Sequence, residues 1–255
     1  MPNPEPWPES WIVPPLRARA GIVLPSANPT VEEEMRALLP PTVRLHVTRL
    51  PDLAGDLQTR VDRYVDHYPD ALRSFGDLAL DTVLIGQTGA SYRLRPDGDR
   101  ALNKALSALR GVPVETVSVS ILEALTYLGC DSVYLLSPYP GWLTERSVGY
   151  WSAAGFRIAG VTQMSDDFIA YTIGTDEVVA ALRKLTVPRG VPVLMSGTGM
   201  TTLDAIRLAL PDLGTPLLSS NLCGAWSVLR RLRIAPPPGT VDVIAPALLG
   251  ALVRA

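Results

Sequence analysis

From residue 17 onward, short apolar runs alternate with longer segments in which apolar positions recur every three to four residues. In the first half, the runs typical of strands cover residues 21–25, 44–50, 82–86 and 112–118, and the segments with helical periodicity cover residues 31–39, 57–80 and 99–109. The 3.6-residue period predicts amphipathic helices, and the apolar runs predict buried strands. Strands that alternate with crossover helices predict parallel sheets covered on both faces, with ligands at the carboxyl ends of the strands.

The same alternation begins again in the second half of the chain. Strands are predicted at residues 132–137, 157–163, 191–196 and 216–219, and helices at residues 142–154, 175–185 and 201–210. Each half contains an apolar strand followed by a turn rich in Gly and Thr, at residues 84–89 (LIGQTG) and 194–199 (LMSGTG). A duplication would produce both turns; the alternative is that strand-to-helix turns favour Gly and Thr in general. Two similar lobes that face each other would bring both turns to one cleft, where N–H groups at helix N-termini can hold an anion.

The N-terminal segment has a different composition. Its first sixteen residues contain six of the 24 prolines, together with Trp7 and Trp11. Proline lacks the N–H group that helices and central strands use, so residues 1–16 are predicted to form an irregular arm.

Composition and charge exclude several classes of protein. The chain has 255 residues, 47% of them hydrophobic, and a net charge of -2, so it can bury a core but offers no basic surface for nucleic acid. No apolar run reaches the roughly 18 to 20 residues of a membrane-spanning helix, and the N-terminus lacks the pattern of a signal peptide. A cytoplasmic protein with no membrane partner is therefore expected. Two cysteines and two histidines predict neither a disulfide framework nor a zinc site, so no metal is expected.

Five short motifs occur in a fixed order along the chain. They are residues 25–30 (PSANPT), 85–92 (IGQTGASY), 137–139 (SPY), 196–204 (SGTGMTTLD) and 219–221 (SSN) with Trp226. Together they resemble the arylmalonate decarboxylase and maleate cis-trans isomerase group of the aspartate/glutamate racemase superfamily, over roughly residues 17–234. The resemblance implies an α/β fold of two pseudo-symmetric, Rossmann-like lobes, each with a roughly four-stranded parallel sheet flanked by helices. It also implies that no cofactor is needed and that a small carboxylate is held in the cleft between the lobes.

The resemblance also suggests how the chain divides. Lobe 1 is expected to comprise residues 17–116 together with about 224–255, and lobe 2 residues 117–223. A homo-oligomer is compatible with this arrangement, but nothing in the sequence specifies one.

Members of this group normally use one or two cysteines as base, acid or nucleophile, each at the end of a strand. The matching positions here are Gly86 and Gly197, and shifting either alignment by one residue gives Gln87 or Ser196. These residues exclude a two-base racemase and a cysteine-dependent isomerase. Decarboxylases of the group keep glycine at the first position, as at Gly86, but rely on the second thiol.

The residues that hold an anion are retained. Gln87, Thr88 and Thr198 offer side-chain and main-chain donors at the two turns, and Tyr139 matches a tyrosine that donates to the substrate carboxylate in the group. Asn28 matches an asparagine near the bound carboxylate; its alternative role is an Asx-turn before Pro29. For Tyr139 the alternative is a half-buried aromatic residue in a proline-flanked loop. Thr88, Tyr139 and Thr198 are the predicted catalytic residues, and the predicted substrate-binding residues are Asn28, Gly86, Gln87, Tyr92, Gly197, Gly199 and Asn221.

The other reactive side chains are given lesser roles. Cys223 lies at the apparent start of a helix, a setting that lowers the pKa of a thiol, although relatives usually carry a small packed residue there. Cys130 is expected to be inert, and His46 and His67 are expected to be structural or solvated.

Four acidic residues lie within or just after the motifs. Glu32, Glu33 and Glu34 would lie in the first turn of a helix, where carboxylates complement the helix dipole, and no further role is expected of them. Asp204 would either orient Thr201 through a local hydrogen bond or belong to a polar helix face.

These observations predict a cofactor-independent enzyme that acts on a small carboxylate or carbonyl compound through an enolate-like intermediate. A lyase is favoured over a racemase or an isomerase. The alternative is a non-catalytic protein that binds or senses a small carboxylate. A new titratable group in the space of the missing thiols would favour the enzyme.

Overall fold

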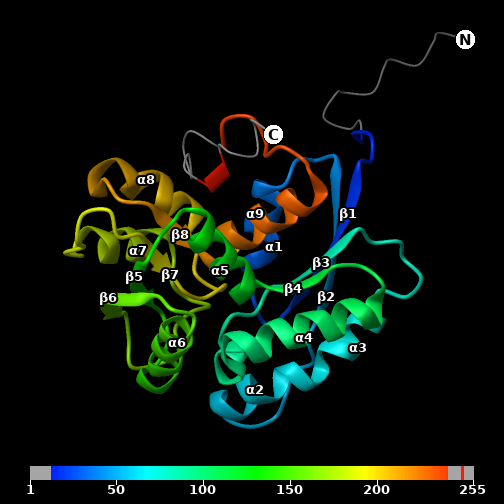
Figure 1. The fold of residues 1–255 in the computed structure, drawn as a ribbon, viewed down its shortest axis with the longest axis horizontal. Helices are drawn as coiled ribbons and strands as arrows, with labels where there is room; N and C mark the ends of the chain where they lie inside the picture. The colour runs from blue at the N-terminus through cyan, green and yellow to red at the C-terminus, as the bar shows by residue number, and fades with distance from the viewer. Residues whose placement is uncertain (1–12, 241–247, 250–255) are drawn as a thin grey trace, which may run out of the picture.

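The computed structural model describes residues 13–240 and 248–249, which form two four-stranded parallel sheets (Figure 1). The first sheet has the order β2-β1-β3-β4, with β1 Ala18–Leu24, β2 Val43–Arg49, β3 Thr82–Ile85 and β4 Val114–Thr116. The second has the order β6-β5-β7-β8, with β5 Ser132–Ser137, β6 Arg157–Gln163, β7 Val193–Met195 and β8 Leu217–Ser219. Every strand pair is parallel, and both sheets repeat one topology. The predicted fold class is confirmed.

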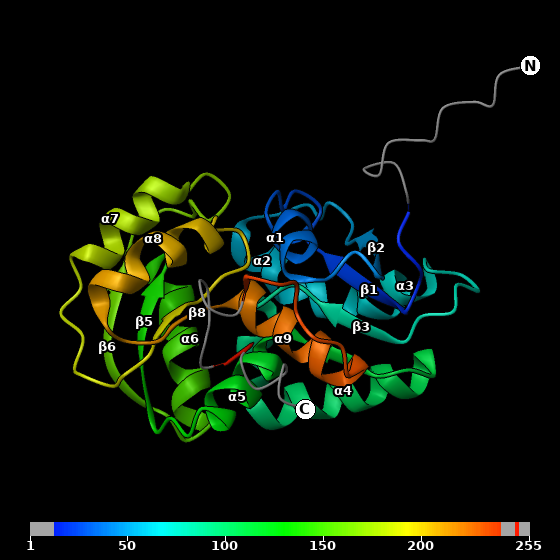
Figure 2. The ribbon, with the colours of Figure 1, turned by 90° about the horizontal axis from the view of Figure 1, so that it is seen from above.

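Helices cover both faces of each sheet (Figures 1 and 2). In the first half these are α1 Val31–Leu38, α2 Leu57–Arg63, α3 Tyr68–Arg73 and α4 Arg95–Arg110, with 3-10 turns at Tyr64–His67 and Gly89–Leu94. In the second half they are α5 Val117–Tyr127, α6 Gly141–Ala153, α7 Thr175–Arg183, α8 Leu203–Leu213 and α9 Ser220–Leu232. Helix α9 follows the second sheet but returns to pack on the first, where Gly224 lies against Leu84.

The burial of the strands explains which of them lie in the middle of each sheet. Ile22, Val23 and Leu24 of β1 are fully buried, as are all residues of β3 and β7. The edge strands β2 and β6 are mostly half-buried. Strands that are covered on both faces read as continuous apolar runs, which is why the pattern located them.

Some predicted boundaries were wrong. The apolar run at 112–118 is a short strand followed at Val117 by α5, a helix that the sequence analysis did not separate because its residues are buried on nearly all sides. The segment 57–80 is divided into α2, a 3-10 turn and α3, and Pro69 lies in the first turn of α3. The helical part ends before Gly76, which has a left-handed backbone conformation. Most of the predicted N-terminal arm and the end of the predicted lobe 1 lie outside the described residues. Within the described residues, no helix is long and apolar enough to span a membrane.

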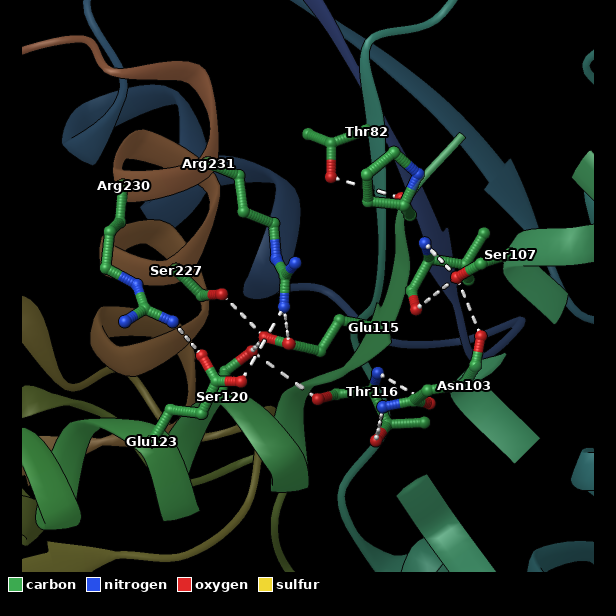
Figure 3. Close-up of polar contacts among 12 residues, drawn as sticks. Thr82, Asn103, Ser107, Glu115, Thr116, Ser120, Glu123, Ser227, Arg230 and Arg231 are labelled. Carbon is green, nitrogen blue, oxygen red and sulfur yellow. Dashed lines mark hydrogen bonds and ion pairs between the residues drawn. The ribbon is translucent and has the colours of Figure 1, made fainter. Parts of the chain in front are cut away.

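A polar cluster joins α5 and α9 to β4, an edge strand of the first sheet (Figure 3). The buried carboxylate of Glu115 accepts hydrogen bonds from Ser120 (2.6 Å) and Ser227 (2.5 Å) and forms an ion pair with Arg231. Arg230 pairs with Glu123 on the neighbouring helix. Because every charge in the cluster has a partner, we assign it a structural role.

A second buried carboxylate, Asp99 of α4, connects the two lobes. It is fully buried and accepts hydrogen bonds from the hydroxyl of Tyr150 in α6 (2.7 Å) and from Thr116 (2.9 Å). Burial raises its pKa from 3.8 to about 6, although these hydrogen bonds act in the opposite direction.

The raised pKa of Asp99 predicts a pH-dependent contribution to stability. The folded state holds this proton more tightly than the unfolded state, so the free energy of unfolding decreases as pH rises from about 3.8 to about 6. We expect the difference in unfolding free energy between wild type and Asp99→Asn to fall by roughly 2–3 kcal/mol between pH 4 and pH 7.5. Urea denaturation at both pH values measures it. An equal difference in unfolding free energy at both pH values would contradict the raised pKa of Asp99.

Candidate active site

The two Gly/Thr turns lie together, as predicted. Residues 86–89 follow β3 and residues 196–199 follow β7, both at the carboxyl ends of parallel strands. The hydroxyl of Thr198 donates to the carbonyl oxygen of Gly86 over 3.2 Å, so the turns touch across the boundary between the lobes. A single cleft therefore receives one turn from each half of the chain.

A pocket of about 260 Å³ opens beside these turns. Its volume is below the ~300–1,000 Å³ typical of sites for drug-sized molecules, which indicates a small ligand. The first lobe contributes Pro25, Ser26, Ala27, Asp52, Leu57, Arg60, Val61, Tyr64, Gln87, Thr88 and Gly89. The second contributes Tyr139, Leu143, Phe168, Ala170, Tyr171, Thr198 and Gly199.

Main-chain donors border this pocket. Among the described residues, the N–H groups of Gln87, Thr88, Thr198 and Gly199 have no hydrogen-bond acceptor. The hydroxyls of Thr88 and Thr198 are engaged, because they donate to Ser220 Oγ (3.1 Å) and to Gly86 O (3.2 Å). The expected side-chain donors of the two threonines are therefore occupied, while their main-chain donors remain available for an anion.

Gln87 contributes both to the structure of the turn and to the pocket. Its side-chain oxygen accepts from the N–H of Ala90 over 2.7 Å, which holds the start of the 3-10 turn. Its side-chain N–H₂ group makes no hydrogen bond with any described residue, so it can donate to a ligand.

Tyr139 occupies the space beside Gly197. A Cβ atom built on Gly197 would lie 3.0 Å from the Tyr139 hydroxyl oxygen and 2.9 Å from Cγ of Pro138. Burial beside Tyr92 and Tyr171 holds the pKa of Tyr139 well above 10, and Thr88 acts weakly in the opposite direction. A phenol with this pKa stays protonated at neutral pH, so it can donate a proton or a hydrogen bond but cannot serve as a ready base.

The conformation of Gly197 makes this turn sensitive to substitution. Its φ of +140° is rarely adopted by residues with a side chain. We expect Gly197→Ala to lower the free energy of unfolding by about 2–4 kcal/mol, since it adds backbone strain and a clash with Tyr139. Gly86→Ala should cost only about 1 kcal/mol, because its Cβ would meet side-chain ends of Leu24 (3.0 Å) and Val31 (3.2 Å). Chemical denaturation of the two variants tests whether Gly197→Ala is the less stable one, and equal stability would contradict this prediction.

Asn28 lies next to the second turn and has the structural one of its two predicted roles. Its side-chain oxygen accepts from the N–H groups of Thr30 and Val31, each at 3.0 Å, which is the predicted Asx-type cap of α1. Its Nδ2 donates to the Thr198 hydroxyl over 3.1 Å. Asn28 does not line the pocket, so it orients Thr198 from behind.

Two residues at the start of α9 hold the turns in place. Ser220, which the sequence predicted only as part of a motif and without a role, accepts from the N–H of Gly197 (3.0 Å) and from the Thr88 hydroxyl, and so connects one turn to the other. Asn221 donates to the carbonyl oxygen of Thr198 (3.2 Å) and to Glu34 (2.7 Å). Asn221 is buried and does not line the pocket.

The expectation that Glu34 only complements the helix dipole was wrong. Glu34 is buried on the core face of α1, and its carboxylate accepts hydrogen bonds from Leu203 N (2.9 Å), the Thr202 hydroxyl (2.9 Å) and Asn221. It thus caps helix α8 of the other lobe. Burial raises its pKa, and these hydrogen bonds act in the opposite direction. Its position three residues after Val31, on the apolar face, was the available signal.

Tyr92 lies behind Tyr139 instead of in the pocket. Its hydroxyl bonds to the Ser196 hydroxyl, and its ring contacts Tyr139 edge-on at a centroid distance of 6.4 Å. Burial raises the pKa of Tyr92 to about 12. The structure therefore places Tyr92 as a support for Tyr139.

Neither cysteine lines the pocket. Cys223 is fully buried, and burial raises the pKa of its thiol, so the expected lowering by the helix N-terminus was wrong. Cys130 is half-buried away from the pocket, and its pKa is also raised by burial. His46 lies in β2, and His67 lies in the 3-10 turn after α2.

Asp204 does not orient Thr201. It is exposed and pairs with Arg207 at 3.3 Å on the surface of α8, in agreement with the alternative of a polar helix face. Within residues 13–240 and 248–249, no three His, Cys, Asp or Glu side chains are placed to hold a metal ion.

Several pocket residues were missed by the sequence analysis, among them Arg60, Tyr64, Phe168 and Tyr171. Arg60 and Tyr64 lie on one face of the α2 segment, with Leu57 and Val61. Phe168 and Tyr171 come from the loop between β6 and α7, where the Phe168 ring stacks on Tyr139 at 6.3 Å. The loop has no regular periodicity, so no pattern located it.

Comparison with known proteins identifies relatives of this chain. A sequence model of the arylmalonate decarboxylase family matches residues 20–241. A maleate isomerase from Nocardia farcinica is 29% identical over 229 residues, which cover 84% of this chain and 90% of that protein. An arylmalonate decarboxylase from Bordetella bronchiseptica is 27% identical over 177 residues, which cover 66% of this chain and 72% of that protein.

The fold agrees with these relatives. A solved structure of a Nocardia farcinica maleate cis-trans isomerase variant, with a covalently bound succinylcysteine intermediate, aligns with a TM-score of 0.80 and 25% identity. The alignment covers 91% of this chain and 98% of that one. Because the family model spans nearly the whole described chain, the protein belongs to the arylmalonate decarboxylase family.

Proposed function

We propose that this protein is a cofactor-independent lyase that decarboxylates a small substituted malonate without a thiol. The observation that carries the proposal is the junction of the two turns. There, N–H groups from both lobes that meet no acceptor in the described part of the chain border the pocket beside the Tyr139 phenol, which fills the side-chain space at Gly197. The relatives, which include an arylmalonate decarboxylase and maleate isomerases, support an enzyme of this type.

The proposed reaction begins with one carboxylate held by the N–H groups of Thr88 and Thr198. The bond between the α-carbon and the second carboxylate breaks, CO₂ leaves, and the electron pair moves into the held carboxylate to form an enediolate. Donors aimed at the oxygens that gain charge stabilise this intermediate more than the substrate. Such donors are typically worth about 10²- to 10³-fold in rate each.

Tyr139 then donates its proton to the α-carbon, which yields a monocarboxylate, and water reprotonates the phenolate. A phenol whose pKa is raised by burial remains loaded with its proton until the carbanion forms. This supports proton donation after bond cleavage, and it disfavours a reaction that must begin with proton abstraction.

The positions of the cysteines favour a lyase over an isomerase. The related isomerase structure carries a succinylcysteine intermediate, so that protein forms a bond between a cysteine and its ligand. Here both thiols lie away from the pocket and have raised pKa values, which leaves little thiolate to attack a double bond.

The test measures CO₂ release from phenylmalonate and conversion of maleate to fumarate. Wild type and the Cys130→Ser/Cys223→Ala variant, checked for folding by thermal denaturation, are compared under the same conditions. We expect both proteins to decarboxylate phenylmalonate and neither to isomerise maleate. Isomerisation that is lost with the cysteines would overturn the proposal. Binding of phenylmalonate without turnover would favour the carboxylate-binding alternative.

A further inference from the structure

One cation faces the pocket from the side of α2. Leu57, Arg60, Val61 and Tyr64 all line the pocket, and their spacing of three, four and seven residues places them on one face of a helix. Three of these side chains are apolar or aromatic. Arg60 is therefore a charged residue on a face that otherwise suits an apolar ligand group.

Arg60 has no carboxylate partner among residues 13–240 and 248–249. Two acidic residues of the helix segment are paired elsewhere, Asp62 with Arg146 (2.6 Å) and Asp66 with Arg93 (3.7 Å). Arg49 is occupied too, because it donates to the carbonyl oxygens of Ser26 and Asn28. The pKa of Asp56 is lowered mainly by hydrogen bonds from Thr59 and also by the charge of Arg60, but the two side chains form no ion pair. The half-buried guanidinium can therefore accept an anion from a ligand.

The surroundings of Arg60 are aromatic on both sides of the cleft. Burial raises the pKa values of Tyr64 and Tyr171, and in both cases the charge of Arg60 acts in the opposite direction. The guanidinium is therefore close to a tyrosine from each lobe. Asp52 is the other charged residue among the described lining residues, and it is exposed, whereas Arg60 is half-buried.

We propose that Arg60 is a specificity-determining residue that selects substrates with a second anionic group, remote from the reacting carbon, at the end of an aromatic or apolar side chain. This inference rests on the proposed function. One carboxylate on the reacting carbon lies at the two turns, the side chain packs among Tyr64, Phe168 and Tyr171, and its terminal anion pairs with Arg60. A planar guanidinium forms two parallel hydrogen bonds with a carboxylate, which fixes the orientation of the ligand.

The remote position of the anion follows from the chemistry. A leaving carboxylate paired with Arg60 would be stabilised in the ground state, which would slow its loss as neutral CO₂. An anion at the far end of the side chain keeps its charge throughout the reaction, so its pairing with Arg60 affects KM and leaves the reacting carbon undisturbed.

The test compares two substrates, phenylmalonate and 2-(4-carboxyphenyl)malonate, which differ only in the terminal carboxylate. Wild type should have the higher kcat/KM for the carboxylated substrate, and added salt should reduce the preference. In Arg60→Leu the ratio of the two kcat/KM values should fall by about 10- to 100-fold, mainly through KM. Arg60→Lys should retain part of the preference, and Asp52→Asn should increase it because an opposing charge is removed.

Arg63→Leu is the matched control, since Arg63 is exposed on the same short helix and does not line the pocket. This variant should keep the wild-type ratio. Wild-type turnover of phenylmalonate with no preference for the carboxylated substrate, or an equal ratio in wild type and Arg60→Leu, would overturn the role of Arg60 alone. If wild type neither turned over nor bound either substrate, the proposed function would be overturned together with this inference.

Discussion

Replacing Tyr139 by phenylalanine is expected to lower kcat for decarboxylation of phenylmalonate by about 10²- to 10³-fold. The substitution removes the phenolic proton and keeps the ring, which stacks on Phe168 and contacts Tyr92. Fold and substrate binding should therefore change little. Steady-state kinetics, together with an unfolding curve for each protein, measure the two effects separately.

The control for this substitution is Tyr134→Phe. Tyr134 bonds to Thr162 over 3.0 Å and does not line the pocket, so its loss should leave kcat within about twofold of wild type. The pKa of Tyr139 lies well above 10, so the acid stays protonated and the wild-type rate should show no alkaline decline from this group below pH 10. A Tyr139→Phe variant with wild-type kcat would exclude the phenol as proton donor.

Replacing Glu34 by alanine is expected to lower the free energy of unfolding by about 3–5 kcal/mol. The carboxylate satisfies the N–H groups of Thr202 and Leu203 and the side chain of Asn221, and its loss would leave these buried donors without an acceptor. Because Asn221 also bonds to Thr198 O, the second turn should lose its position and activity should fall as well. Urea denaturation gives the first effect and kcat/KM the second.

Glu33→Ala is the matched control, since Glu33 is the preceding residue of the same helix and is exposed. It should change stability by no more than about 0.5 kcal/mol. Glu34→Gln should lie between the two variants, because it keeps one acceptor oxygen. If Glu34→Ala were as stable as Glu33→Ala, Glu34 would not hold the lobes together.

The periodicity of the sequence predicted both sheets because strands such as β1 and β3 are buried on both faces and therefore read as continuous apolar runs. It also located the two turns, where Gly86, Gly197 and Gly199 stand at positions at which a Cβ would come within 3.0 Å of neighbouring side chains. Helix α5 was missed for the same reason that the strands were found: eight of its eleven residues are buried, so it lacks a polar face.

The sequence predicted those site residues that belong to a single local motif, but not the contacts between segments that are distant in the chain. Gly197 and Tyr139 were singled out separately, but their proximity arises from packing between two segments that follow different strands. The role of Glu34 depends on partners more than 160 residues away. Arg60 lies on a stripe of four pocket residues, and only the fold reveals that this stripe faces a cavity instead of the core.

A crystal structure of the Tyr139→Phe variant with bound phenylmalonate tests the central claim most directly, because the ligand should persist when the proton donor is absent. We expect one carboxylate to accept hydrogen bonds from the N–H groups of Thr88 and Thr198 at about 2.7–3.2 Å, with the α-carbon facing the ring at position 139. A ligand bound in the pocket with neither carboxylate in contact with either turn would contradict the account.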